Sequence, residues 1–352
     1  MKKVSKCYAI AFCALLVCVS CSAPKKKPMA GDTVRIGFSI ASDTFIIERW
    51  NKDVKIFSGA AHELGAEVLV QLSAGGTREQ MSQINFLLTR DIDVLVVIAH
   101  DYELLSGVIK KVRDAKIPVI AYDRLIYGVP VDAYISFNNR EVGRLFGKAL
   151  KQEVPRGRYV IINGSVRDNN SFEVNAGLKE IIGSSIQSGE ISIVEEVWLQ
   201  DWSSDEAREK MAAILERTTD IQAVSCANDQ IASAVIQLLA EYRLAGKVAV
   251  VGQDADIGAC QKIVEGTQLM TVYKPIVRLA SRAAELAVTL VRGTLPSPDA
   301  YIDNNSGTPV PYYMEEPRSV FQSNMDSSVI RDGFHSAEDV YRNVRVLSDQ
   351  DE

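Results

Sequence analysis

Ten polar or aromatic residues stand where apolar, strand-like runs give way to the following helical stretches. They carry carboxylates, carboxamides, guanidinium groups, one ammonium group and two indoles: Arg49, Trp50, Asp123, Arg124, Asp168, Asn170, Trp202, Asn228, Asp254 and Lys274. Each sugar hydroxyl both donates and accepts a hydrogen bond, so a carboxylate can take its proton while a guanidinium, ammonium or amide group bonds to its oxygen. Indole rings offer an apolar surface to the C–H faces of a pyranose. The set therefore predicts a site for a neutral polyol.

Several of these residues also allow a purely structural interpretation. Asp123 and Arg124 could form an ion pair at the end of a strand, without any ligand. Trp50 and Trp202 could pack the lobes, because large rings are common in protein cores. The sequence alone leaves these interpretations open beside the binding role.

Helix capping is a further alternative at two of the strand ends. Asn228 or Asp229 could cap the helix that follows, and for Asp229 capping is the role we expect. Asn169, which stands between Asp168 and Asn170, is expected to be a turn residue.

The chain lacks the sequence motifs of common enzyme classes. The patterns GxGxxG, GxxxxGK[ST], GxSxG, HExxH and the calcium loop DxDxDG do not occur, and His62, His100 and His335 are too far apart to suggest a metal site. A glycosidase could use Asp123 and Asp254 as paired carboxylates. Basic neighbours would keep both ionised, however, whereas a general acid needs a raised pKa. We therefore expect a binding protein without a metal or a cofactor.

Short apolar runs alternate with amphipathic stretches from Val34 onward, which is the pattern of βαβ units in a parallel sheet. The first five runs are VRIGFSI, EVLVQL, VLVVIA, VIAYD and YISF; after a helix that begins near Asn138, the next five are YVIING, ISIVEEVW, AVSCAND, VAVVGQD and MTVYK. The first five runs are too continuously apolar for half-exposed strands, so these strands should lie between two helix layers. The pattern predicts an α/β protein of two similar doubly wound parallel-sheet lobes.

Helices and lobe boundaries follow from the same pattern. We expect helices over Glu48–Leu64, Thr77–Arg90, Leu104–Ala115 and Ile276–Val291, capping boxes at Thr77–Gln80 and Ser203–Glu206, and a strand at Tyr312–Met314. The N-terminal lobe should comprise 33–138 plus about 275–304 and the C-terminal lobe 139–274 plus about 305–335, followed by a polar tail over 336–352. Several crossings between the lobes would then form a hinge. Ligands of such sheets bind beyond the carboxyl ends of the strands.

The first 20 residues are typical of an export signal. Three lysines precede an apolar run, Tyr8–Val19, that is shorter than the ~20 residues of a bilayer-spanning helix. A small residue before Cys21 predicts lipoprotein cleavage and lipidation of that cysteine, and 21–32 would be a tether. Plain secretory cleavage near Ala23 is the alternative. We expect a protein on the periplasmic or cell-surface side of a membrane, anchored through Cys21.

Composition and charge narrow the class of protein. The chain has 352 residues, 47% hydrophobic and 24% charged, which excludes disorder. A formal charge of -6 argues against nucleic acid as a partner. Only Cys226 and Cys260 would remain as free thiols after cleavage and lipidation, and we expect both to be buried.

Seven segments resemble the family of bacterial periplasmic D-xylose-binding proteins, which are sugar-binding components of ABC transporters with the type I periplasmic binding fold. They are ERWNKD (48–53), REQMSQI (78–84), AYDRLI (121–126), AYISFNN (133–139), VRDNN (166–170), GQDAD (252–256) and MTVYKPI (270–276). The resemblance extends from about Val34 to His335. It implies that Trp50 and Trp202 sandwich one pyranose ring and that the eight polar residues named above contact its hydroxyls. The loop SDTFIIE (42–48) and the longer polar tail depart from the family pattern.

The resemblance and the residues together imply a transport role. We expect an exported, lipid-anchored monomer that captures a monosaccharide, D-xylose first, and delivers it to an ABC permease. The alternative is a sugar sensor whose closed, ligand-bound form docks on a chemoreceptor or a histidine kinase.

Overall fold

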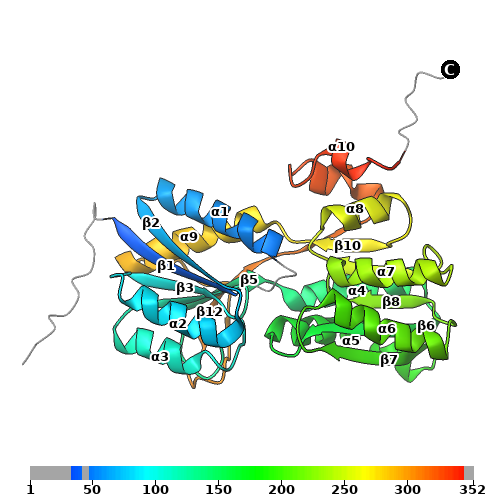
Figure 1. The fold of residues 1–352 in the computed structure, drawn as a ribbon, viewed down its shortest axis with the longest axis horizontal. Coiled ribbons are helices and arrows are strands. Elements are labelled where there is room, and N and C mark those ends of the chain that lie inside the picture. Colours follow the sequence, from blue (N-terminus) through cyan, green and yellow to red (C-terminus); the bar gives the residue numbers. More distant parts are fainter. Residues whose placement is uncertain (1–32, 42–46, 345–352) are drawn as a thin grey trace, which may run out of the picture.

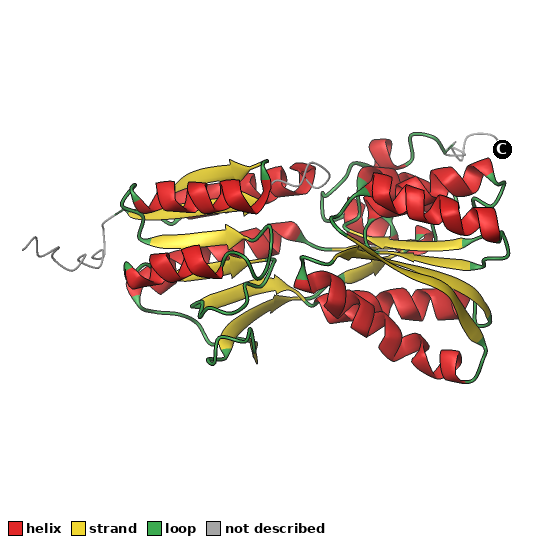
Figure 2. Ribbon diagram, turned by 60° about the horizontal axis from the view of Figure 1, so that its bottom comes forward, coloured by secondary structure: helices red, strands yellow, loops and turns green. Residues whose placement is uncertain are grey.

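The protein folds into two α/β lobes that lie side by side (Figure 1). The computed structural model describes residues 33–41 and 47–344, and every structural statement refers to these. One sheet has seven strands in the order β11-β12-β5-β4-β3-β1-β2, and the other has six in the order β13-β10-β9-β8-β6-β7. Helices flank both sheets (Figure 2), so the predicted pair of doubly wound lobes is confirmed.

The first lobe is built mainly from the N-terminal third of the chain. Its elements are β1 (Val34–Ala41), α1 (Ile47–Glu63), β2 (Ala66–Ser73), α2 (Gly76–Leu88), β3 (Val94–Ile98), α3 (Ser106–Asp114), β4 (Val119–Tyr122), β5 (Ala133–Phe137), α9 (Ile276–Arg292), β11 (Ala300–Ile302) and β12 (Val310–Glu315). Alternate residues of β3 point to opposite faces: Val96 packs in the cluster with α1 and α9, whereas Leu95 packs with α2 and α3. Both faces are thus buried, which is why the strand is apolar throughout.

The second lobe repeats this plan. Its elements are α4 (Asn139–Glu153), β6 (Gly157–Ser165), α5 (Asn169–Gln187), β7 (Ile191–Leu199), α6 (Ser204–Arg217), β8 (Ala223–Cys226), α7 (Asp229–Glu241), β9 (Ala249–Gln253), α8 (Ile257–Val264), β10 (Met270–Tyr273), β13 (Arg318–Val320), a 3₁₀ turn (Gln322–Asn324), a π turn (Asp326–Ile330) and α10 (Ala337–Val340). Cys226 and Cys260 are free and buried in this lobe, as predicted. Burial raises the pKa of both thiols.

The chain passes between the lobes three times, after β5, after β10 and after β12. The last crossing differs from the prediction, which assigned residues from 305 onward to the C-terminal lobe. Strand β12 instead pairs in parallel with β5, with Tyr312 opposite Tyr134. The crossing therefore lies after Glu315. The physical reason is that β5 offers an open sheet edge, and β12 covers it.

Helix starts test the two predicted capping boxes. The box at Thr77–Gln80 does not form, because the buried Gln80 side chain donates to the Ile98 carbonyl at 2.8 Å and accepts from the His100 amide at 2.9 Å. Helix α2 is thereby tied to the end of β3. The box at Ser203–Glu206 forms only in its serine half: the Ser203 hydroxyl accepts from the Glu206 amide at 3.2 Å, whereas the Glu206 carboxylate accepts from the Gln200 amide at 3.0 Å.

Candidate functional site

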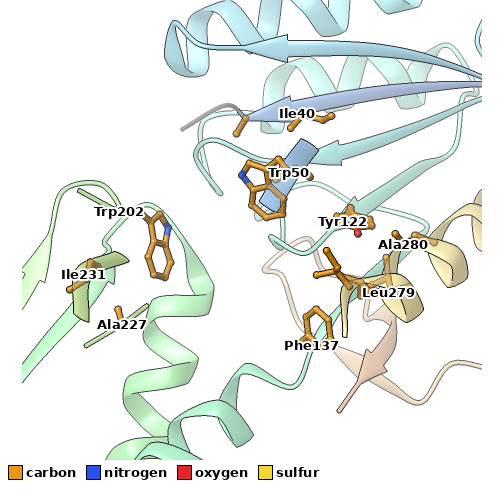
Figure 3. Close-up of a cluster of buried hydrophobic side chains, with 14 of the residues drawn as sticks. Ile40, Trp50, Tyr122, Phe137, Trp202, Ala227, Ile231, Leu279 and Ala280 are labelled. Carbon is orange, nitrogen blue, oxygen red and sulfur yellow. The ribbon is translucent and has the colours of Figure 1, made fainter. Parts of the chain in front are cut away.

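A cavity lies between the lobes at the carboxyl ends of the strands. All ten residues singled out in the sequence line it, together with one more, Gln253. About 300 Å³ of space is free of protein atoms there, the open mouth included. Figure 3 shows Trp50 and Trp202 coming from opposite lobes and facing the gap between them. We call this cavity, with its eleven lining residues, the cleft.

The wall from the first lobe is formed by the start of α1 and the end of β4. Arg49 donates from Nη2 to Asp123 Oδ1 at 2.7 Å. Asp123 has a left-handed backbone with φ of 60°, and its carbonyl accepts from the hydroxyl of Ser136 at 2.8 Å. The Tyr134 hydroxyl, also on β5, donates to the same carbonyl at 3.1 Å. These two bonds from β5 hold Asp123 in a conformation that non-glycine residues seldom adopt. The Arg49 guanidinium also lies 4.5 Å from the centre of the Trp50 ring.

The wall from the second lobe is formed by the N-termini of α5 and α7. Asp168 caps α5, because its carboxylate accepts from the Asn170 amide at 3.0 Å. The same carboxylate accepts from Trp202 Nε1 at 3.2 Å and so fixes the indole. Asn228 caps α7 by accepting from the Ile231 amide at 2.9 Å. Both caps also line the cleft, so the structural and the binding interpretations do not exclude each other.

Two capping and turn expectations are wrong in detail. Asp229 does not cap α7, because its buried carboxylate accepts from the Thr271 hydroxyl at 2.7 Å and from the Gln268 amide at 2.9 Å. Asn169 is the first residue of α5 rather than a turn residue, and it accepts from the Tyr127 hydroxyl at 2.9 Å. In both cases a tertiary partner, invisible in the local sequence, decides the role.

Ion pairs cross from one lobe to the other at the cleft. Arg124 Nε lies 2.9 Å from Asp168 Oδ2, and Arg49 Nη1 lies 3.7 Å from Asp254 Oδ1. Asp123 and Arg124 are thus each paired with a residue distant in sequence, whereas the structural alternative expected an ion pair between these two neighbours. Both indoles also belong to the main apolar cluster, with Trp50 only 1% and Trp202 only 6% exposed. Their packing role is therefore real beside their place in the cleft.

Burial and ion pairing shift the pKa values of the ionisable groups at the cleft. Burial raises the pKa of Asp123, but Arg49 and Lys274 outweigh it and hold that pKa below its ordinary value. Burial of the Lys274 ammonium group lowers its pKa. Asp53, one helical turn after Arg49, lies behind the cleft and accepts a short hydrogen bond from the Tyr122 hydroxyl. Burial raises the pKa of Asp53 to about 7.

Sequence reasoning missed Asp53 and Gln253. The helical spacing of Asp53 from Arg49 and the position of Gln253 beside Asp254 were the available signals. Four cleft atoms are buried without a hydrogen-bond partner within the described chain: Arg49 Nε, Trp50 Nε1, Gln253 Oε1 and Asp254 Oδ1. Leaving such a group unbonded costs about 1–3 kcal/mol. The cleft residues thus hold two donors and two acceptors that no protein group among the described residues satisfies.

No group of three or more metal-ligating side chains occurs within 33–41 and 47–344. Across those residues no helix is both long and apolar enough to span a bilayer. Cys21 and most of the loop 42–48 lie outside the described residues.

The fold and the cleft define a two-lobed binding protein of the periplasmic type. Residues 38–295 match the family described as the periplasmic binding protein domain, and the chain belongs to that family. It is 41% identical over 309 residues to the D-xylose-binding periplasmic protein of Haemophilus influenzae, covering 88% of this chain and 92% of that one. It is 42% identical over 303 residues to the D-xylose-binding periplasmic protein of Escherichia coli, covering 86% and 91%.

Solved structures agree on the architecture. A carbohydrate transporter solute-binding protein from Chloroflexus aurantiacus in complex with D-glucose has a TM-score of 0.82 at 24% identity, covering 88% of this chain and 98% of that one. An ABC transporter solute-binding protein from Clostridium phytofermentans with bound β-D-glucose has a TM-score of 0.80 at 26% identity, covering 87% and 99%.

Proposed function

We propose that this protein captures a monosaccharide, D-xylose first, in the cleft and delivers it unchanged to an ABC permease. The observation that carries the proposal is the cleft itself, where two indoles from opposite lobes lie among acidic and basic side chains that form ion pairs with one another. The names of the relatives at 41% and 42% identity support D-xylose as the first sugar to test.

The polar groups suit hydroxyls better than a charged ligand. Asp254 Oδ1 lies 3.7 Å from Arg49 and 3.6 Å from Lys274, which is ion-pair distance but longer than a hydrogen bond. A hydroxyl seated there can donate to the carboxylate and accept from either cation. A sugar that lacks this hydroxyl, or presents it on the other face, leaves the buried groups unbonded and binds less well.

Capture depends on contacts from both lobes. Trp50 and Asp123 belong to the first lobe, whereas Trp202 and Asp168 belong to the second. A sugar that touches both walls favours the closed arrangement over an open one, with the three crossings as the hinge. The closed surface is then the form that a permease recognises.

We infer binding without chemistry on the sugar. Arg49 and Lys274 keep the Asp123 carboxyl ionised, so it is a poor general acid. Asp53, whose pKa is raised, is not among the residues that line the cleft. The relatives named above are binding proteins by name.

Export and anchoring complete the proposal. The relatives are periplasmic proteins by name, and the sequence of the first 20 residues predicts export with lipidation of Cys21. A lipidated N-terminus would hold the binding protein, as a monomer, close to its permease. More than one acyl chain makes such an anchor stable.

A thermal-shift panel of pentoses, hexoses and their phosphates tests the function. Binding to the native state alone adds about 2.7 kcal/mol of stability when the sugar is present at a hundredfold excess over its dissociation constant. We expect D-xylose to raise the melting temperature of the mature protein and sugar phosphates to leave it unchanged. A panel in which no neutral monosaccharide raises the melting temperature contradicts the proposal.

A further inference from the structure

Asp254 reaches the cleft from a backbone turn that is unfavourable for its residues. The turn joins β9 to α8, and its residues Asp254 and Ala255 have φ of 98° and 54°. Both values lie in the left-handed region, where a Cβ clashes with the backbone. Such a conformation is unfavourable and persists only where the surroundings hold it. The contacts that hold this turn therefore decide where the Asp254 carboxylate lies.

One set of contacts comes from within the second lobe. The Asp254 amide donates to the Val272 carbonyl at 2.8 Å, and the Ala255 amide donates to the Thr271 hydroxyl at 3.2 Å. The buried Asp229 carboxylate accepts from that hydroxyl and, at 3.1 Å, from the Asp256 amide. The inner side of the turn is thus fixed by β10 and α7.

A second set comes from the segment after the last strand, β13. His335 Nε2 donates to the Ala255 carbonyl at 2.7 Å. The neighbouring Phe334 ring lies 5.0 Å, centre to centre, from the ring of Tyr273, which precedes Lys274. The ammonium group of Lys52 on α1, in the opposite lobe, lies 5.3 Å from the centre of the same Phe334 ring. We call Phe334 and His335 the clasp.

The clasp contacts the chain next to three cleft residues. Ala255 follows Asp254, Tyr273 precedes Lys274, and Lys52 lies on the helix turn that carries Arg49. The clasp also lines a second cavity of about 540 Å³, open mouth included, which shares Arg49, Asn228, Asp254 and Lys274 with the cleft.

We propose that the clasp is a positioning element of the sugar site, in which His335 holds the Asp254–Ala255 turn so that the Asp254 carboxylate stays between Arg49 and Lys274. Phe334 joins the same region to α1 of the other lobe, so the contact forms fully when the lobes are together. The proposal rests on the proposed function, because the clasp acts on a sugar only through Asp254.

Substitution of His335 tests the clasp. In His335→Ala the Ala255 carbonyl loses its side-chain donor, and we expect D-xylose affinity to fall about tenfold in calorimetric titration. In His335→Gln the amide can again donate to that carbonyl, so most of the affinity should return. His62→Ala, which removes an exposed histidine at the end of α1, is the matched control and should bind as the wild type does.

A double-mutant cycle separates positioning from general stability. In an Asp254→Asn background, His335→Ala should change D-xylose affinity by less than about twofold, because the carboxylate that it positions is gone. Unchanged affinity in His335→Ala, or no recovery in His335→Gln, overturns the clasp and leaves the proposed function standing. A wild-type protein that binds no monosaccharide overturns both.

Discussion

The guanidinium group of Arg49 lies among three carboxylates that come from both lobes. It donates to Asp123 at 2.7 Å, and it lies 3.7 Å from both Asp254 and Asp53. The ionisable groups around the cleft are three cations and four carboxylates: Arg49, Arg124, Lys274, Asp53, Asp123, Asp168 and Asp254. One carboxylate is therefore in excess, and protonation of Asp53, which has no exposed surface, brings the buried charges into balance.

The raised pKa of Asp53 predicts a pH-dependent effect of Asp53→Asn on stability. Burial raises this pKa from 3.8 to about 7. As the pH rises from about 4 to about 7, the unfolded chain loses this proton while the folded state keeps it, so the folded state is destabilised relative to the unfolded chain. Asparagine keeps an acceptor for the Tyr122 hydroxyl and carries no charge. The difference in unfolding free energy between the variant and the wild type should therefore increase in the variant's favour by on the order of 2 kcal/mol from about pH 5 to about pH 8.

Thermal or urea unfolding of both proteins at the two pH values measures this gain. Other titrating groups are common to the two proteins, so they cancel in the difference. A stability difference that stays the same at both pH values would contradict an elevated pKa for Asp53.

Helices α4 and α5 meet at glycines, and this contact places the α5 N-terminus at the cleft. A Cβ on Gly177 would lie 1.9 Å from the Arg140 carbonyl oxygen of α4, whereas a Cβ on Gly183, on the same helix, would meet no atom within 4 Å. Asp168 and Asn170 begin α5. The helix contact therefore supports one wall of the cleft from behind.

The two glycines of α5 give opposite predictions. Gly177→Ala should destabilise the protein by about 1–3 kcal/mol, because the added methyl group forces the helices apart. Gly183→Ala should stabilise it by roughly 0.5–1 kcal/mol, because alanine loses less backbone freedom in a helix. Urea unfolding of the two variants compares them directly, and effects of the same sign would contradict the close contact.

The parallel strands that alternate with helices could be predicted from the sequence, and the short antiparallel edge strands could not. The ten runs form β1 to β10; eight of these lie inside a sheet, where an apolar run between helix layers is expected, whereas β2 and β7 lie at sheet edges and are partly exposed. Strands β11 and β13 have three residues each and pair at sheet edges, so they leave no comparable pattern. The lobe of β12 depends on its pairing with β5, which local sequence does not reveal.

At the site, the types of residue at the strand ends predicted which residues line the cleft. They did not predict the hydrogen bonds and ion pairs that these residues form. Ten side chains were found because a parallel sheet brings its strand ends to one edge. Asp229 was assigned to a cap because nothing local marks its bonds to Thr271 and Gln268. Asp53 and His335 form hydrogen bonds with residues distant in sequence, Tyr122 and Ala255, so these contacts emerge only in the folded protein.

The whole molecule joins two similar lobes through three crossings, with the cleft between them. Each lobe contributes one indole and its own set of charged groups. In the proposed function neither wall alone surrounds a pyranose, so tight binding would require both lobes at once. We propose that this shared cleft, with Trp202 as one of its two aromatic walls, holds the sugar.

Calorimetric titration of D-xylose into the wild type, Trp202→Ala and Trp198→Ala tests that claim. Trp198 stacks on Phe172 at 4.7 Å and is not a cleft residue, so it is the matched control, with circular dichroism showing that both variants are folded. We predict one sugar per wild-type chain, a loss of about a hundredfold in Trp202→Ala and unchanged affinity in Trp198→Ala. Equal affinity in the two tryptophan variants, or loss in Trp198→Ala alone, would contradict the account.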